Sequence, residues 1–167
     1  MNFVDNSSQK LITTENQINL YKYIGKWYEL ARLSNTFTPN NATVVTVEYS
    51  LNNDNTVTVV NKAFLSTTLC QKIEGIARVL DSSNSKFEVQ FEGTTFKGYY
   101  YIYKIFDDYS FAIVGDPNSN MCWLLSRSLL LTVEKFYLLA QNLIWLKYDI
   151  NQFIFSPSIK ITNKILF

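Results

Sequence analysis

The segment YIGKWYELAR, residues 23–32, decides how the rest of this chain is interpreted. Gly25 permits a backbone bend that a side chain would hinder. Trp27 follows it and offers the largest apolar surface of any residue, with one N–H that needs an acceptor. We therefore expect a short turn and then a strand. Because side chains alternate between the faces of a strand, parity predicts one face with Trp27, Glu29, Ala31 and Leu33 and the other with Tyr28, Leu30 and Arg32.

Length and composition limit the class of protein. The 167 residues suit one domain with a sizeable core. Hydrophobic residues make up 47% of the chain and aromatics 16%, and a net charge of +1 gives no reason to expect nucleic acid. The sequence has no histidine, which removes His-dependent nucleophilic triads and the commonest zinc ligand. We expect no metal and no cofactor.

The N-terminal segment does not indicate a compartment. Residues 1–20 lack the basic start, apolar middle and small-residue cleavage site of a signal peptide, and no cysteine near the start offers a lipidation site. No stretch approaches the roughly 20 apolar residues of a transmembrane helix. We expect a periplasmic or outer-membrane-associated protein if a signal has been removed, and a cytoplasmic one otherwise.

Short β-rich runs separated by turn residues occupy the chain after the first strand. We predict eight consecutive antiparallel strands: the first ends near Leu33, and the others cover residues 43–49, 56–64, 71–80, 86–91, 98–106, 109–114 and 121–127. Such a meander closes into an up-and-down barrel, which leaves no free edge. A barrel of this strand number can hold one small ligand. The predicted fold class is therefore all-β, with one helix packed outside the barrel.

That helix is expected over residues 132–147. Thr132 suits an N-cap and Glu134 the first turn. Helical spacing predicts a core-facing stripe of Val133, Phe136, Ala140, Leu143 and Ile144. A last short strand over residues 149–155 follows. We divide the chain into a loose lead-in (1–15), a barrel with its helix (16–157) and an apolar tail (158–167).

Leu138 and Trp145 lie opposite the predicted core-facing stripe of the helix. An exposed apolar pair of this kind usually has a partner. We expect either a second subunit, giving a homodimer, or residues 159–167 of the tail.

Two motifs resemble a known family. GKWYELAR (residues 25–32) is similar to the first signature of the lipocalins, in the form of their bacterial and apolipoprotein D-like branch, and WLLSR (residues 123–127) is similar to the third. The second is represented by DDY (residues 107–109), although Phe106 stands where the family has an aspartate. The resemblance covers residues 15–157 and implies an eight-stranded calyx. It also implies that Gly25, Trp27 and Arg127 close one end, with the arginine lying over the indole, a cation–π arrangement.

Matching the strands to this family assigns one set of alternating side chains to the barrel interior. The predicted ligand-binding lining is Val45, Val47, Tyr49, Val59, Asn61, Ala63, Ala77, Val79, Val89, Phe91, Tyr100, Ile102, Met121, Trp123 and Leu125. It is apolar and aromatic with a few polar atoms, as small-molecule pockets are. The alternative is a filled barrel with no cavity.

Glu29, Asn61 and Lys104 are predicted to point inward as well. Because an unpaired buried charge is costly, we expect them to contact one another or trapped water. An acid–base pair is the alternative. Cys70 is expected in a loop and Cys122 on the outward face of the eighth strand, too far apart to be bridged and neither suited to act as a pocket nucleophile.

Three function classes remain open. The first is a carrier or store of small lipophilic molecules; the resemblance implies fatty acids, lysophospholipids or similar compounds, and a role linked to membranes or stress. The second is an enzyme that uses the same cavity, with no catalytic residue assigned. The third is a protein-interaction module with a filled barrel. We expect a non-enzymatic binder.

Overall fold

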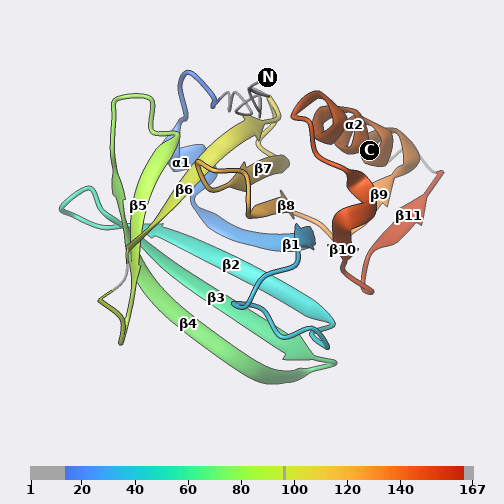
Figure 1. Cartoon of the computed structure of the whole chain (residues 1–167), viewed down its shortest axis with the longest axis horizontal. Helices are drawn as coiled ribbons and strands as arrows, with labels where there is room; N and C mark the ends of the chain where they lie inside the picture. Colours follow the sequence, from blue (N-terminus) through green and yellow to red (C-terminus); the bar gives the residue numbers. More distant parts are fainter. Residues whose placement is uncertain (1–13, 96, 164–167) are drawn as a thin grey trace, which may run out of the picture.

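The computed structural model describes residues 14–95 and 97–163, and its main body is a closed antiparallel barrel. Each strand pairs with the next, and the last pairs with the first, as predicted (Figure 1). The barrel strands are β1 (Gly25–Leu33), β2 (Val44–Leu51), β3 (Val57–Leu65), β4 (Thr68–Val79), β5 (Lys86–Phe91), β6 (Lys97–Ile105), β7 (Phe111–Gly115) and β8 (Cys122–Ser126). Most of the predicted lead-in and residues 164–167 of the predicted tail lie outside the described residues.

Two α-helices accompany the barrel among the described residues. α2 (Val133–Trp145) confirms the predicted helix: the Thr132 side chain accepts a hydrogen bond from the Lys135 N–H, and Glu134 lies in the first turn. α1 (Leu20–Tyr23), capped by the Asn19 side chain, was not predicted. No helix in the described part of the chain is long and apolar enough to cross a membrane.

The segments around α2 gather on one side of the barrel (Figure 1). After η1 (Ile150–Gln152), β10 (Phe153–Phe155) pairs antiparallel with β1, where a last short strand was expected. β11 (Lys160–Thr162), in the predicted tail, pairs parallel with β9 (Leu130–Thr132), which precedes α2. The sequence pattern did not predict this two-stranded pairing.

A β-bulge at Leu30 changes the predicted faces of β1. Glu29 lies opposite Leu125 of β8, but Ala31, two residues on, lies opposite the adjacent Leu124, so the pairing shifts by one residue. Leu30 and Ala31 consequently both face outward. The prediction that Ala31 shares a face with Trp27 was therefore wrong.

A second bulge, at Tyr103 in β6, has the same effect. The register shifts between Ile102 and Lys104, and Lys104 lies opposite Ile113, whose side chain faces outward. The prediction that Lys104 points into the barrel was therefore wrong. Its Nζ lies 3.2 Å from Glu15 Oε1, on the outside of the barrel.

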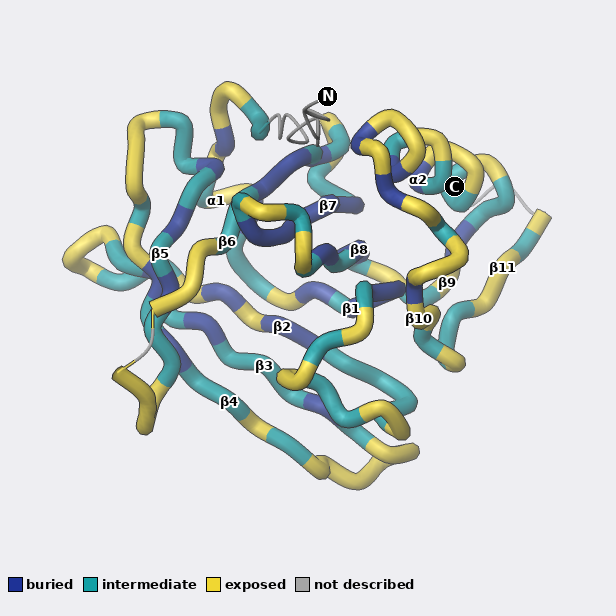
Figure 2. Tube along the Cα trace, viewed as in Figure 1, coloured by how far each residue is buried: buried dark blue, intermediate teal, exposed yellow. Residues whose placement is uncertain are grey.

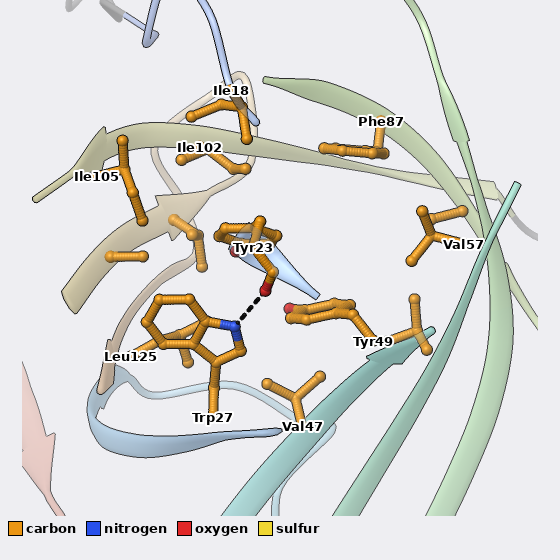
Figure 3. Close-up of a cluster of buried hydrophobic side chains, with 14 of the residues drawn as sticks. Ile18, Tyr23, Trp27, Val47, Tyr49, Val57, Phe87, Ile102, Ile105 and Leu125 are labelled. Atoms are coloured by element: carbon orange, nitrogen blue, oxygen red, sulfur yellow. Dashed lines mark hydrogen bonds between the residues drawn. The ribbon is translucent and has the colours of Figure 1, made fainter. Parts of the chain in front are cut away.

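Buried apolar side chains form two clusters on opposite faces of the same sheet. The inner cluster fills part of the barrel interior, and Figure 3 draws its members around Trp27 and Tyr49. The outer cluster lies between the barrel wall and α2 and includes Leu30, Ile113, Leu124, Leu139 and Leu143. β7 is buried along its whole length (Figure 2), because one of its faces packs in the inner cluster and the other in the outer cluster.

The helix buries part of the predicted stripe: Leu143 is in the outer cluster, and Phe136 packs against it. Leu139 and Leu143 are its buried residues. Ile144, predicted to face the core, is 62% exposed. Leu138 and Trp145 are exposed as expected, and the described part of the tail does not cover them.

Candidate functional site

A cavity of about 170 Å³ lies inside the barrel. It is lined by residues of α1, by both ends of several strands, and by Phe37 and Thr38 of the β1–β2 loop. Most of the lining is aliphatic or aromatic, and the polar atoms come from a few side chains such as Glu29, Asn61 and the tyrosines. A lining of this kind suits an apolar molecule with one polar group.

The structure brings most of the predicted lining residues together around this cavity. Those that line it are Val45, Val47, Tyr49, Val59, Asn61, Ala63, Ala77, Val89, Phe91, Tyr100, Met121, Trp123 and Leu125. The other two do not: Val79 packs against the inner cluster from its edge, and Ile102 is fully buried within that cluster.

Sequence reasoning missed several residues that also line the cavity. Phe87 shares the parity of Val89 in β5, so alternation alone points to it. Leu20, Tyr23 and Ile24 form the floor, and they carried no such signal because a four-residue helix is too short to show periodicity. Phe37 belongs to a loop, where side-chain alternation gives no prediction.

Arg127 and Trp27 close the floor of the barrel. The guanidinium carbon lies 3.7 Å from the centroid of the indole ring. Its nitrogens donate to the backbone carbonyls of Lys26 at 2.7 Å, Lys22 and Ile24 at 2.9 Å, and Tyr23 at 3.0 Å. Arg127 therefore ties the C-terminal end of β8 to α1 and the turn into β1.

The same turn supplies the hydrogen-bond acceptor that the Trp27 N–H needs. Trp27 Nε1 donates to the carbonyl oxygen of Tyr23 at 2.8 Å, the dashed contact of Figure 3. Gly25, which has φ +92°, allows the chain to reverse from α1 into β1. A Cβ at Gly25 would lie 3.5 Å from Arg127 Nη1, an ordinary van der Waals contact, so the positive φ rather than the space beside the guanidinium requires a glycine here.

Three tyrosine hydroxyls meet just above this floor. Tyr49 donates to Tyr100 at 2.9 Å, and the hydroxyls of Tyr23 and Tyr100 are hydrogen-bonded to each other. Burial raises the pKa of all three phenols, that of Tyr49 to about 12. The group therefore stays neutral across the physiological range and offers hydroxyl dipoles rather than charge.

A buried ion pair stands in the cavity wall. Arg32 Nη1 donates to Glu29 Oε1 at 2.7 Å, and both side chains are almost fully buried. Burial raises the pKa of the Glu29 carboxyl, and the charge of Arg32 acts in the opposite direction. The partners predicted for Glu29 were Asn61, Lys104 or trapped water, whereas the bulge at Leu30 turns Arg32 to the inner side, where it pairs with Glu29.

The cysteines lie away from the cavity. Cys70 is in β4, not in a loop as predicted, because that strand begins at Thr68; its Sγ donates to the carbonyl of Ala63 at 3.2 Å. Cys122 is buried in the outer cluster, and the two form no disulfide. Among residues 14–95 and 97–163, no three His, Cys, Asp or Glu side chains lie close enough to hold a metal ion.

Comparison with known proteins agrees with this geometry. Residues 18–158 match the family model described as a Lipocalin-like domain. The chain is 31% identical to temperature-induced lipocalin-1 of Arabidopsis thaliana, covering 84% of this chain and 79% of that protein. It is 36% identical to the outer membrane lipoprotein Blc of Vibrio cholerae, covering 65% of this chain and 64% of that protein.

Solved structures share the fold at lower identity. Insecticyanin from the tobacco hornworm Manduca sexta superposes with a TM-score of 0.70 at 18% identity, covering 87% of this chain and 84% of the other. Lobster apocrustacyanin A1 gives a TM-score of 0.65 at 18% identity, covering 83% and 78%. The barrel, the closure of its floor and the family match lead to one conclusion: this chain is a member of the lipocalin family.

Proposed function

We propose that the barrel binds one elongated lipophilic molecule, a fatty acid or lysophospholipid, and stores or carries it. The observation that carries this proposal is the apolar cavity inside a fully hydrogen-bonded wall. Membership of the lipocalin family, whose members are mostly non-enzymatic binders of small hydrophobic molecules, supports it.

The ligand enters at the end opposite Arg127. Trp27 and Arg127 cover the floor, while Phe37 and Thr38 of the β1–β2 loop line the cavity at the other end. An alkyl chain placed along the cavity contacts small side chains such as Ala63 and Ala77, which leave room for it. Each methylene buried in this way contributes about 0.8 kcal/mol. Several of them suffice for micromolar affinity after the cost of association.

A role linked to membranes or stress accompanies this proposal. One relative is named for its induction by temperature and another as an outer membrane lipoprotein. For this chain we propose the handling of lipids released from or destined for a membrane. A homodimer through the exposed Leu138 and Trp145 stays a prediction.

The test combines native mass spectrometry of the purified protein with displacement of an apolar fluorescent dye. Dodecanoic acid and a lysophospholipid should displace the dye from the parent. Ala63→Trp fills the cavity, since Ala63 lines it and is 3% exposed, and should weaken dye and lipid binding at least tenfold.

Val60→Trp is the matched control, since Val60 lies on the same strand and does not line the cavity. This variant should bind dye and lipid as the parent does. The proposal fails if neither lipid displaces the dye, or if Ala63→Trp binds as tightly as Val60→Trp.

A further inference from the structure

A second cavity, the Arg32 chamber, lies beside the main one. It is lined by Glu29, Arg32, Val45, residues 40–43 of the β1–β2 loop and residues 154–157 of the β10 region, and has a volume of about 200 Å³. Glu29 and Val45 line both cavities, so the two spaces adjoin at these side chains. The chamber is near the mouth, because Arg32 stands at the end of β1 distant from Gly25.

The Arg32 guanidinium has more N–H donors in this chamber than the neighbouring acceptors can satisfy. Nη1 is paired with Glu29 at 2.7 Å, and Nη2 reaches the carbonyl of Pro39 only at 3.5 Å, the limit of a hydrogen bond. Nε has no partner in the part of the chain that the structure describes, although the side chain is only 5% exposed. A buried guanidinium has five N–H donors to satisfy, so this one requires a further acceptor.

The other walls of the chamber suit an oxygen-rich group with an apolar stem. Asn40 and Asn41 carry amide donors at its exposed rim. Ile154 and Phe155 supply apolar surface to its lining. Carboxylate and phosphate are the groups that match a guanidinium best, through short charge-assisted hydrogen bonds.

We propose that the Arg32 chamber binds the anionic head, carboxylate or phosphate, of the lipophile whose chain occupies the main cavity. This inference rests on the proposed function and assigns the orientation of the ligand: tail toward the floor, head beside Arg32. The floor is the weaker place for a charged head, because the hydroxyls of Tyr23, Tyr49 and Tyr100 already bond to one another.

Glu29 has a definite role in this arrangement. It is the acceptor with which an incoming anion competes for Arg32, and its negative charge opposes the anion. Its burial already disfavours the charged form, as the raised pKa of its carboxyl indicates. Glu29 is therefore a selectivity residue: removing its charge should strengthen binding of an anionic head, whereas removing the charge of Arg32 should weaken it.

The experiment compares ligands of one chain length. Dodecanoic acid, dodecyl phosphate and the uncharged dodecanol are titrated against the parent, Glu29→Gln and Arg32→Met, with inorganic phosphate alone as a further probe. Glu29→Gln should bind the acid and the phosphate ester at least threefold more tightly, and Arg32→Met at least tenfold more weakly. Dodecanol should change less than threefold in both variants. Inorganic phosphate should not compete with the lipids at millimolar concentration.

Ala42→Leu provides a variant that leaves both charges in place. Ala42 lines the chamber and not the main cavity, so the larger side chain should exclude the head and weaken the two anionic lipids selectively. If Arg32→Met does not fold, this variant together with Glu29→Gln decides the question.

The outcomes separate the two proposals. If dye and dodecanol bind the parent but the acid shows no preference that depends on Arg32, Glu29 or Ala42, the orientation is wrong and the carrier function stands. Competition by inorganic phosphate would also overturn the inference, because the chamber would then bind a free anion. If neither the dye nor any lipid binds, the carrier function fails and the inference falls with it.

Discussion

Leu124 and Leu125 are neighbours in β8 and equally buried, each 2% exposed, yet they belong to different kinds of interior. Leu124 faces the outer cluster under α2, where the residual void is about 10 Å³. Leu125 faces the inner cluster and lines a cavity of about 170 Å³. Burial alone therefore does not tell whether a side chain packs against other side chains or borders a space for a ligand.

The difference arises from what covers each face. Outward-facing side chains of β1, β7 and β8 are met by large residues of the helix, such as Leu139 and Leu143, which interdigitate with them. Inside the barrel the opposite wall is another strand, held at a distance by the closed hydrogen-bond ladder. Small residues such as Ala63 and Ala77 then leave the middle unfilled.

Truncating the two leucines tests this contrast directly and should give the largest effect. Leu124→Ala should lower the free energy of unfolding by about 2–5 kcal/mol, because it opens a cavity in a filled cluster. Leu125→Ala should cost about 1–2 kcal/mol, since its side chain already borders an empty space. Denaturant unfolding measures both. Equal losses would mean that the inner cluster is as tightly packed as the outer one.

Removing Arg127 breaks the floor of the inner cavity only. Arg127→Ala loses the contact with Trp27 and five hydrogen bonds to backbone carbonyls, including the long one from Nε to Tyr109. We expect a loss of about 3 kcal/mol in unfolding free energy and a red shift in tryptophan fluorescence as water reaches the indole. Arg127→Lys, which keeps the charge without the planar fork, should recover part of the stability. An unchanged melting temperature in Arg127→Ala would contradict the closure.

Weakening α2 tests how much this helix, which covers the outer cluster, contributes to stability. Thr132→Ala removes the side chain that accepts from the Lys135 N–H and should cost about 1 kcal/mol. Thr132→Ser retains the hydroxyl and should remain near the parent in thermal unfolding. Dye binding in the inner cavity should be the same in all three proteins. A change in dye affinity would show that the two interiors are coupled.

The ion pair in the inner wall gives the smallest effect, seen as a pH dependence. The pKa of Glu29 in the folded protein is raised above the ordinary value of 4.5. A carboxyl of this kind stabilises the fold at low pH, and that contribution disappears as the pH rises through the folded-state pKa. As the pH rises above the ordinary pKa of 4.5 and through the raised folded-state pKa, the parent should therefore lose stability relative to Glu29→Gln. Parallel stability curves would show that the carboxyl is not perturbed.

The strands, the closed barrel and the capped helix follow from the sequence because their signals are local. Alternation marks the strands, asparagine and aspartate mark the turns, and Thr132 with Glu134 marks the start of α2. The family motifs then indicate which parity faces inward. Most of the predicted cavity lining lies around the cavity for this reason.

The failures concentrate where alternation is interrupted. The bulges at Leu30 and Tyr103 shift every later side chain of their strands to the other face, and nothing in the residue types announces them. Arg32 and Lys104 exchanged roles as a result: the expected outer cation is buried beside Glu29, and the expected inner one contacts Glu15. The predicted stripe of α2 included the buried Leu143 but also the exposed Ile144, and it missed Leu139, because the packing of the helix against the barrel fixes which face is buried.

The pairing of β1 with β8 has a consequence for how the protein folds during its synthesis. The barrel cannot close until Ser126 meets Tyr28, and Arg127 must reach the carbonyls of α1 across about a hundred residues of chain. At roughly 5–20 residues per second, the ribosome needs roughly 5–20 s to make the intervening segment. During that time β1 emerges with an unpaired edge, which is a template for association with other chains. We expect closure of this long loop to limit the folding rate.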